Sequence, residues 1–540
     1  MKKSKTLLLA LFSFASTTLL AQQQNNWTWG GPLDPEQAKY DVKHYTLRLA
    51  VAPQQKRISG SVDVRVKVLE PTDLIRLNLI DAYTVDAVKV NGKKAGFTRT
   101  PDGLDVQLRK KVQPGQVVTV QVGYAGLAPE AVRPPWQGGF TFAQDANGKH
   151  WVGLSSQNEG AKIFMPCKDH PSDEPDEGVT QYITVPAGYV AAANGLLQGQ
   201  TQQNGSVTYH WQSNYTTNNY GINFTVGDFV ALQREYTTIE GNKMPMVVYL
   251  LRQNESKLPE LMDVLETSLR TQEKYFGEYP FWKEKAGVVE TPYLGMEHQT
   301  INAYGNKFRF TKVGQTTHDN LLYHELGHEW WGNKVSVRDW ADFWIQEGLC
   351  SYGDWLFVEE HAGHEAYLKH VQQVARSIPN RTPIIQRENM DSDEAYHGEI
   401  YTKGAHVMHS LRFLLGEELF FKTIRGFLSS PAHTYANQVK TADLQQYITE
   451  HTGQDIAPFF DLYLRTTEVP EVLVQKLGAD SYAISIPNIN FALPMDVQTD
   501  TGTQRLTLSK EPQQVKSAAP PLVDAQGWYL KRIRTEKGTL

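Results

Sequence analysis

The chain has 540 residues, of which 40% are hydrophobic and 21% are charged, so it is long enough to form several globular domains. Its formal net charge is −6 at pH 7, and no block of basic residues indicates a nucleic acid or an anionic membrane as a partner. The two cysteines, Cys167 and Cys350, are too few for a disulfide-stabilised scaffold. They either pair with each other or remain two buried thiols, and we favour the thiols.

The first residues have the pattern of a signal peptide. Lysines at positions 2, 3 and 5 precede an apolar stretch over residues 7–20, and Ala21 offers a cleavage point. The apolar stretch is short for a membrane span, and the polar run that follows it disfavours a buried N-terminal helix. We therefore predict that residues 1–21 are removed, and that the protein is exported to the periplasm or the extracellular space. No stable membrane insertion is expected after processing.

Residues 40–234 have the alternation of β-strands. Val62, Val64, Val66 and Val68 form one alternating run, and similar runs lie at 45–51 and 118–124. Turn dipeptides such as Asn91-Gly92 separate these runs. Residues 22–245 are therefore predicted to form a large antiparallel β domain.

The pattern becomes helical after Tyr249. Ser256 and Pro259, followed by leucines at helical spacing, predict a capped amphipathic helix. Further helical patterns lie at 321–331, 354–374 and 403–415, and alternation returns from Pro470 onward. We predict a mostly helical domain over 246–466 and a small β domain over 467–540.

The strongest chemical signal is the run from His324 to His328, His-Glu-Leu-Gly-His. On a helix, positions i and i+4 share one face, so both imidazoles can reach one metal ion while Glu325 projects beside it. Upstream, Thr316-x-x-Asp319 is a candidate cap for this helix. The alternative is that both histidines are satisfied core residues and that Glu347, further along the chain, is a solvated surface acid.

A third ligand follows at a suitable distance. Glu347 comes after His328 with eighteen intervening residues, within a second helical pattern. A catalytic zinc takes three protein ligands and keeps one position open for water, and two histidines with one glutamate are a known set. The sequence therefore predicts one zinc ion per chain on His324, His328 and Glu347.

These residues, with Trp330-Trp331-Gly332-Asn333 between them, resemble the aminopeptidase N family of gluzincin metallopeptidases, which also includes leukotriene hydrolase. The resemblance extends from the β region to about Arg465. It implies an α+β multidomain fold, with an N-terminal antiparallel β saddle domain and a thermolysin-like, mostly helical catalytic domain. A short C-terminal β domain would follow, because the stretch after Arg465 is too short for the large helical domain of bigger members.

Upstream of the zinc motif, Leu294-Gly295-Met296-Glu297-His298 resembles the exopeptidase motif of that family, Gly-Ala-Met-Glu-Asn. The resemblance implies that Gly295, Met296 and Glu297 bind substrate, with the acid holding the free α-ammonium. That group is largely cationic at neutral pH, so a fixed carboxylate can select it. Leu294 and His298 depart from the family pattern, and their effect is left open.

Two further segments match the family. The run from Ser156 to Gly160 resembles the segment that completes the amine pocket, with Gln157 and Glu159 as equal candidates. Tyr401-Thr402-Lys403-Gly404-Ala405 resembles the element in which the tyrosine hydroxyl stabilises the oxyanion. A phenol can donate a hydrogen bond at neutral pH without carrying charge, which suits that role.

The expected function is zinc-dependent removal of N-terminal residues from peptides, with Glu325 as general base and Tyr401 as oxyanion donor. An open-cleft zinc endopeptidase and a peptide-binding pseudoenzyme that retains zinc are the alternatives. An epoxide hydrolase on the same site is a further rival that nothing in the sequence requires. The preferred N-terminal side chain and the oligomeric state are left open.

Overall fold

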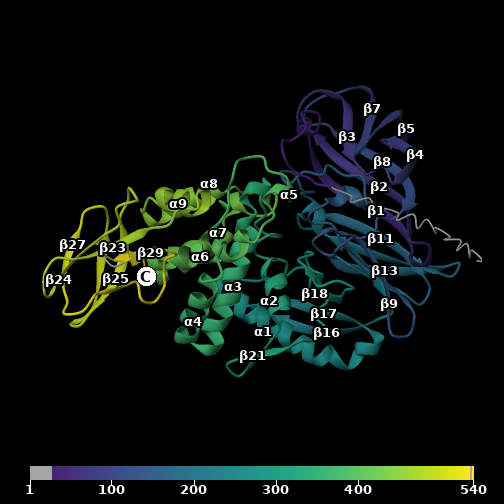
Figure 1. The fold of residues 1–540 in the computed structure, drawn as a ribbon. Coiled ribbons are helices and arrows are strands. Elements are labelled where there is room, and N and C mark those ends of the chain that lie inside the picture. Colours follow the sequence, from purple (N-terminus) through teal and green to yellow (C-terminus); the bar gives the residue numbers. More distant parts are fainter. Residues whose placement is uncertain (1–26, 536–537, 540) are drawn as a thin grey trace, which may run out of the picture.

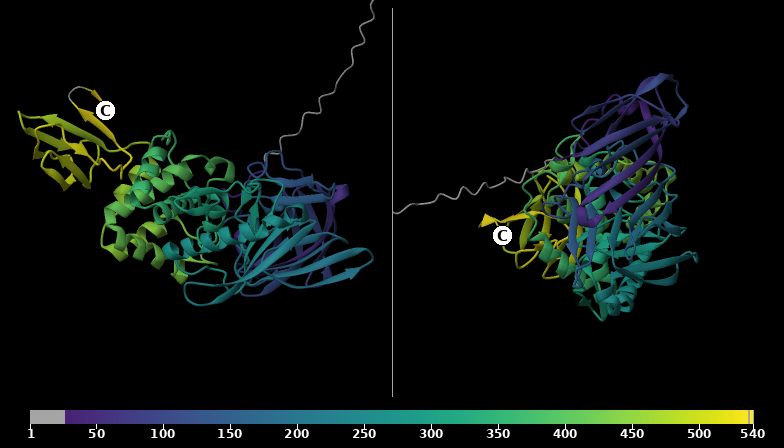
Figure 2. Two further views of the ribbon diagram at one scale, coloured as in Figure 1. Left: turned by 90° about the horizontal axis from the view of Figure 1, so that it is seen from below. Right: turned by 90° about the vertical axis from the view of Figure 1, so that its right-hand side faces the viewer.

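The computed structural model describes residues 27–535 and 538–539. It is elongated, with a helical region between an N-terminal β region and a C-terminal β region at the opposite end (Figures 1 and 2). The predicted signal peptide, residues 1–21, lies outside the described residues. Within the described part of the chain, no helix has the length and apolar character that a membrane span requires.

An eight-stranded sheet forms most of the N-terminal β region. The valines at 62, 64, 66 and 68 are all buried, because alternate side chains of a strand point to the same face and here that face covers the core. Most of its strand pairs are antiparallel as predicted, but β1 and β11 run parallel. In sheet order, the strands are β13 (Leu196–Gln203), β14 (Ser206–Ser213), β11 (Val179–Pro186), β1 (Tyr40–Ala52), β2 (Arg57–Val68), β8 (Val117–Leu127), β4 (Tyr83–Val90) and β5 (Lys93–Lys94).

Two smaller sheets complete this region. One, in sheet order, contains β12 (Val190–Ala193), β15 (Phe224–Gly227), β10 (His150–Ser155) and β9 (Gly139–Gln144). The other contains β3 (Thr72–Asn78), β7 (Gly103–Val112) and β6 (Phe97–Thr100). The loop after β10 leads to Gln157 and Glu159, so the small sheet places both candidates of the amine pocket.

A five-stranded sheet opens the helical region and carries the predicted exopeptidase motif on its last strand. The predicted domain boundary at 245/246 falls inside β17, which pairs with β16 and β18. The five-stranded sheet already begins with β16 at Phe229, so the boundary between the two regions lies before that residue. The predicted boundary is too late because alternation identifies a strand without revealing which sheet it joins. In sheet order, the strands are β16 (Phe229–Thr237), β17 (Lys243–Leu251), β18 (Ala286–Glu290), β20 (Asn302–Tyr304) and β19 (Gly295–Met296).

Helix α1 connects β17 to β18 of this sheet, and the other helices follow the sheet in the chain (Figure 1). The predicted helical pattern at 354–374 is divided between two helices, which break at Gly363, where φ is +88°. A short hairpin, β21 (Thr311–Val313) and β22 (Thr316–His318), leads into the second helix. The helices are α1 (Leu258–Phe276), α2 (Asn320–Gly327), α3 (Trp344–Ala362), α4 (His364–Ala375), α5 (Ser392–Ala395), α6 (Glu399–Leu415), α7 (Glu417–Leu428), α8 (Thr441–Thr452) and α9 (Ala457–Arg465).

Both predicted helix caps are wrong in detail. Helix α1 has Lys257 at its N-cap without a side-chain hydrogen bond, because Ser256 lies in a preceding 3-10 turn. Helix α2 is capped by Asp319 itself, which accepts a hydrogen bond from the Leu322 amide, whereas Thr316 lies in β22. In both cases the preceding segment adopts its own structure and moves the helix start toward the C-terminus.

The C-terminal β region has two sheets, and five residues separate the end of α9 from its first strand. The first, in sheet order, contains β27 (Gln513–Lys516), β24 (Ser481–Ser485), β23 (Glu471–Lys476), β29 (Arg532–Thr535) and β30 (Gly538–Thr539). The second contains β26 (Gly502–Leu508), β25 (Leu493–Thr499) and β28 (Leu522–Val523).

The two cysteines do not pair. Cys167 is buried in the core of the N-terminal β region, and Cys350 is buried in α3. Both are free thiols, as favoured from the sequence.

Candidate active site

Three side chains from two helices meet at one point. His324 lies on α2, His328 is the C-cap of that helix, and Glu347 lies on α3. Their ligand atoms all lie within 4.8 Å of one another. Nε2 of each histidine is 3.4 Å from Oε2 of Glu347. The structure thus brings together the three predicted metal ligands.

The outer nitrogen of each imidazole is held by an acceptor. Nδ1 of His324 is 3.0 Å from Oδ2 of Asp354, and Nδ1 of His328 is 2.9 Å from the Trp331 carbonyl oxygen. A nitrogen facing an acceptor carries the proton, so the lone pair of each Nε2 faces Glu347. Sequence reasoning missed Asp354, although it follows Glu347 by two helical turns on α3 and the i, i+7 spacing was available as a signal.

This arrangement fits a cation. Oε2 of Glu347 is buried and has no hydrogen-bond partner, and two nitrogen lone pairs face it. Ligand atoms about 2.1 Å from a tetrahedral ion lie about 3.4 Å apart, which matches the observed separations. Burial opposes ionisation of Glu347, but positive charge beside it, carried by His328 and His324 when they are protonated, lowers its pKa to about 2. The carboxylate is therefore anionic, as a metal ligand must be.

The turn after α2 needs a glycine. Gly332 has a φ of +135°, and a Cβ there would lie 3.3 Å from Nδ1 of His328. The start of α2 is fixed by Asp319, which also accepts a hydrogen bond of 2.8 Å from the Tyr304 hydroxyl. The helix that carries both histidines is thus anchored at its N-cap and at the turn that follows it.

Glu325 lies beside the metal ligands against β19. A Cβ at position 295 would lie 2.5 Å from Oε1 of Glu325, so only glycine leaves room for this carboxylate. Burial raises the pKa of Glu325 to about 8. A buried carboxylate with a raised pKa accepts a proton more readily than an exposed one, which suits a general base.

Glu297 is the second carboxylate of the site. Its ligand atom lies within 4.8 Å of those of Glu325 and His328. Its Oε1 accepts hydrogen bonds from the Gln157 side-chain amide and, at 3.0 Å, from the Tyr220 hydroxyl. Burial is the main cause that raises the pKa of Glu297, and a bound ammonium would supply the counter-charge that lowers it again.

The structure separates the two candidates that the sequence left equal. Gln157 contacts Glu297, whereas Glu159 turns away and accepts a hydrogen bond of 2.6 Å from the Gly138 amide. Burial raises the pKa of Glu159 to about 8, and its second oxygen is buried without a partner. Gln157 is therefore the residue of this loop that contacts Glu297. Tyr220 was missed, since nothing in its local sequence indicates what it contacts.

The two departures from the family motif have different surroundings. Leu294 is 40% exposed and lines the cavity of the site. His298 is fully buried, and its Nε2 is 3.1 Å from Nδ2 of Asn223. Burial lowers the pKa of His298 to about 3, so its ring is neutral and adds no charge beside Glu297.

Tyr401 reaches the cluster from α6. Its hydroxyl lies 3.0 Å from Oε1 of Glu347 and 2.5 Å from the hydroxyl of Tyr396, another residue that sequence reasoning missed. Helices α3 and α6 approach closely because each has a glycine where they cross. A Cβ on Gly348 would lie 3.0 Å from Cα of Gly404. Burial raises the pKa of Tyr401, so the phenol remains a donor at neutral pH.

A cavity of about 220 Å³ joins these groups. Both carboxylates, the three predicted metal ligands, the tyrosine pair and several apolar side chains line it. Its lining residues are Pro135, Trp136, Gln157, Leu294, Gly295, Met296, Glu297, His324, Glu325, His328, Glu347, Tyr396 and Tyr401.

Comparisons with known sequences agree with this geometry. The Peptidase M1 N-terminal domain matches residues 41–220, and the Peptidase family M1 domain matches residues 261–463. Fold and site together define a zinc-site protein of the gluzincin class. The chain belongs to peptidase family M1, the aminopeptidase N family. The family implies one zinc ion per chain, and both the predicted fold class and the predicted family are confirmed.

Named relatives are distant in sequence. Aminopeptidase N of Haemonchus contortus is 22% identical over 487 residues, which cover 83% of this chain and 48% of the relative. Aminopeptidase N of Escherichia coli (strain K12) is 27% identical over 244 residues, 42% of this chain and 28% of the relative. The chain thus spans about half the length, or less, of these curated relatives.

Solved structures match over more of their length. The M1 zinc metallopeptidase of Deinococcus radiodurans, as a mutant bound to a Tyr-Ser-Ala substrate, has a TM-score of 0.69 and 26% identity. The match covers 80% of this chain and 95% of that chain. Another structure of the same enzyme has a TM-score of 0.68 and 25% identity, and covers 80% of this chain and 96% of the other.

Proposed function

We propose that this protein is a zinc-dependent aminopeptidase that removes residues one at a time from the free N-termini of peptides. The observation that carries the proposal is the position of Glu297 within 4.8 Å of Glu325 and His328. A carboxylate so close to the metal cluster leaves room for about one residue between the bound ammonium and the scissile carbonyl. The substrate peptide of the Deinococcus structure supports the same class of substrate.

The edge strand β19 supplies a place for the peptide backbone. It is the last strand of its sheet, since β20 pairs with it on one side through Gly295 and Met296 and no described strand pairs on the other. An extended peptide can add to such an edge through main-chain hydrogen bonds. An antiparallel peptide would then direct its N-terminus toward Glu297, which follows the strand.

His324, His328 and Glu347 would hold the zinc ion, which supplies a Lewis acid for the scissile carbonyl and lowers the pKa of water. Glu325 takes the proton of the attacking water and passes it to the leaving amine. Tyr401 donates its hydroxyl hydrogen to the oxygen that becomes negative in the transition state.

The rival functions differ in what they require of these residues. A pseudoenzyme has no need of a general base, yet Glu325 keeps a glycine opposite it and Tyr401 stays within reach of the cluster. An endopeptidase would leave Glu297 without a cationic partner, although two donors hold that carboxylate in place. None of these contacts favours epoxide hydrolysis over peptide hydrolysis.

N-acetylation of a peptide should reduce its cleavage at least tenfold. Acetylation removes the charge that Glu297 binds and adds bulk at that end of the cavity, and a charge-assisted hydrogen bond contributes about 1.5–3 kcal/mol. Release of the first amino acid from a tripeptide and from its N-acetyl form would measure the ratio.

Glu297→Gln and Glu297→Ala should weaken cleavage of the free tripeptide by a similar factor and barely change any residual cleavage of the blocked one. Glu297→Gln keeps the shape of the side chain, so it separates charge from packing. If the acetylated peptide is cut as fast as the free one, at internal bonds, the protein is an endopeptidase and the amine pocket has another role.

We also propose that the protein is exported, on the basis of the lysines and the apolar stretch that begin the sequence. Expression of the full chain in a Gram-negative host, with cell fractionation and mass spectrometry of the N-terminus, should find a product in the periplasm or medium that begins at Gln22. A cytosolic product that keeps residues 1–21 would contradict this proposal.

A further inference from the structure

A short segment ahead of β1 runs between the N-terminal β region and the helical region. Trp29 belongs to it, is 5% exposed, and precedes both matched family domains. The Trp29 carbonyl accepts a hydrogen bond of 3.0 Å from the Ser392 amide at the start of α5. Two residues later, the Gly31 amide donates to the Met390 carbonyl at 3.0 Å. The segment is therefore tied to the loop that leads to Tyr396 in the active site.

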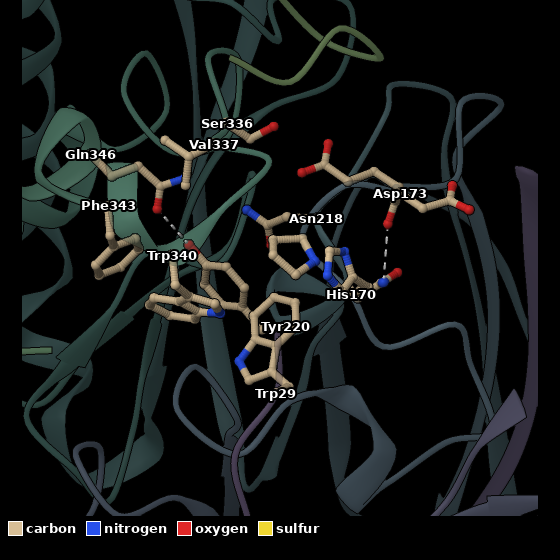
Figure 3. A pocket seen from close by; sticks show the side chains of 13 residues that line it. Trp29, His170, Asp173, Asn218, Tyr220, Ser336, Val337, Trp340, Phe343 and Gln346 are labelled. Carbon is tan, nitrogen blue, oxygen red and sulfur yellow. Dashed lines mark hydrogen bonds between the residues drawn. The ribbon is translucent and has the colours of Figure 1, made fainter. Parts of the chain in front are cut away.

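The side chain of Trp29 contacts Gln157 and Tyr220, the two residues that donate hydrogen bonds to Glu297. Its Nε1 donates a hydrogen bond of 2.5 Å to the main-chain carbonyl of Gln157. Its ring packs against Tyr220, with ring centroids 5.8 Å apart, and meets Trp340 edge-on at 5.3 Å. Figure 3 shows these three rings together at one side of a pocket that they share with Gln346.

The two residues that Trp29 contacts, Gln157 and Tyr220, donate hydrogen bonds to the same carboxylate oxygen. The amide of Gln157 and the hydroxyl of Tyr220 donate to Oε1 of Glu297. No other side chain among the described residues donates to this carboxylate, so its orientation depends on these two donors. Oε2 is left for the substrate ammonium. Trp29 thus contacts both of the groups that orient the Glu297 carboxylate.

Apart from Trp29, the helical region also contacts the main chain next to Gln157. Ser392 supplies this contact, because its hydroxyl donates to the Asn158 carbonyl at 2.6 Å. Trp340 provides a contrast within the same pocket: it is just as buried, but its Nε1 has no hydrogen-bond partner. Only Trp29, of these two tryptophans, joins its indole N–H to the loop of the amine pocket.

We propose that Trp29 is a positioning residue for the amine pocket: it fixes the main chain of Gln157 and the ring of Tyr220, and through them the orientation of Glu297. A segment outside the two family domains thereby completes the site from behind. The inference rests on the proposed aminopeptidase function, in which Glu297 reads the substrate's free ammonium.

Trp29→Phe is the direct test, because phenylalanine keeps an aromatic ring against Tyr220 and loses the N–H. With leucyl-aminomethylcoumarin as the probe, KM should rise about three- to tenfold, since one buried hydrogen bond is lost. The change in kcat should stay below about twofold, because the metal cluster is untouched. The matched control is Trp340→Phe, which removes an N–H that bonds to nothing and should change KM by less than about twofold.

A double-mutant cycle with Glu297→Ala separates positioning from general loosening. If Trp29 acts through Glu297, Trp29→Phe should add little to the KM of the Glu297→Ala variant. Equal KM values for Trp29→Phe and Trp340→Phe, or a full additional loss in the Glu297→Ala background, would overturn the proposal.

Should Trp29→Phe fail to fold, Ser392→Ala decides. The Ser392 hydroxyl accepts a hydrogen bond of 3.4 Å from the Trp29 amide and donates one of 2.6 Å to the Asn158 carbonyl, so its removal loosens both Trp29 and the loop of Gln157. KM should therefore rise in this variant too, and should not rise further in the Glu297→Ala background. An unchanged KM would count against the proposal. If the wild-type protein cleaves free and acetylated peptides equally well, the proposed function itself has failed. If the wild type does prefer free peptides, but Trp29→Phe and Trp340→Phe have equal KM values, only the role of Trp29 is rejected.

Discussion

Glu325→Gln is expected to lower kcat by about 10²–10⁴-fold while the protein keeps its zinc. Glutamine has the shape of glutamate and fits the space opposite Gly295, where a Cβ would lie 2.5 Å from Oε1. Its amide cannot take a proton from water, so the base is lost without loss of packing. The three proposed ligands, His324, His328 and Glu347, are unchanged, and elemental analysis should still find near-stoichiometric zinc.

Glu325→Asp provides the matched comparison. It keeps a carboxylate but withdraws it by one methylene, so turnover should fall less than in Glu325→Gln. If Glu325→Gln loses zinc together with activity, Glu325 acts as a metal ligand and the assignment of the base is wrong. Turnover close to that of the wild type would remove Glu325 from the chemistry altogether.

Tyr401→Phe should lower kcat by about 10²–10³-fold with little change in KM. The hydroxyl, 3.0 Å from Oε1 of Glu347, can reach an oxygen bound near the cluster, and its contribution appears only when that oxygen becomes negative. Burial keeps the pKa of Tyr401 above its usual range, so the hydrogen is available throughout the neutral pH range. Steady-state kinetics on a free aminoacyl substrate separate kcat from KM.

Tyr396→Phe is the control for this variant. Tyr396 lines the cavity, and its hydroxyl is 2.5 Å from that of Tyr401. If Tyr396 acts only by orienting Tyr401, its replacement should lower kcat by a smaller factor than Tyr401→Phe does. If Tyr401→Phe turns over at a near-normal rate, the hydroxyl of Tyr401 serves packing and the oxyanion must be stabilised elsewhere.

Local patterns in the sequence determined much of this protein. The alternating valines of β2 follow from the geometry of a single strand, which needs no knowledge of its neighbours. His324 and His328 share a face because four residues are about one helical turn. Tyr401 and Glu297 are predicted from short motifs that resemble those of the family. In each case, the information lies within a few residues along the chain.

The tertiary structure decided the matters that depend on contacts between distant segments. Whether Gln157 or Glu159 meets Glu297 depends on how a loop of the N-terminal β region lies against β19, and both side chains are polar enough for either position. The sheet that β16 joins is likewise set by its partner β17 and not by its own alternation. Trp29 reaches Gln157 across 128 positions of the chain. A hydrogen bond is specified by distance and direction in space, and local sequence restricts neither for residues so far apart.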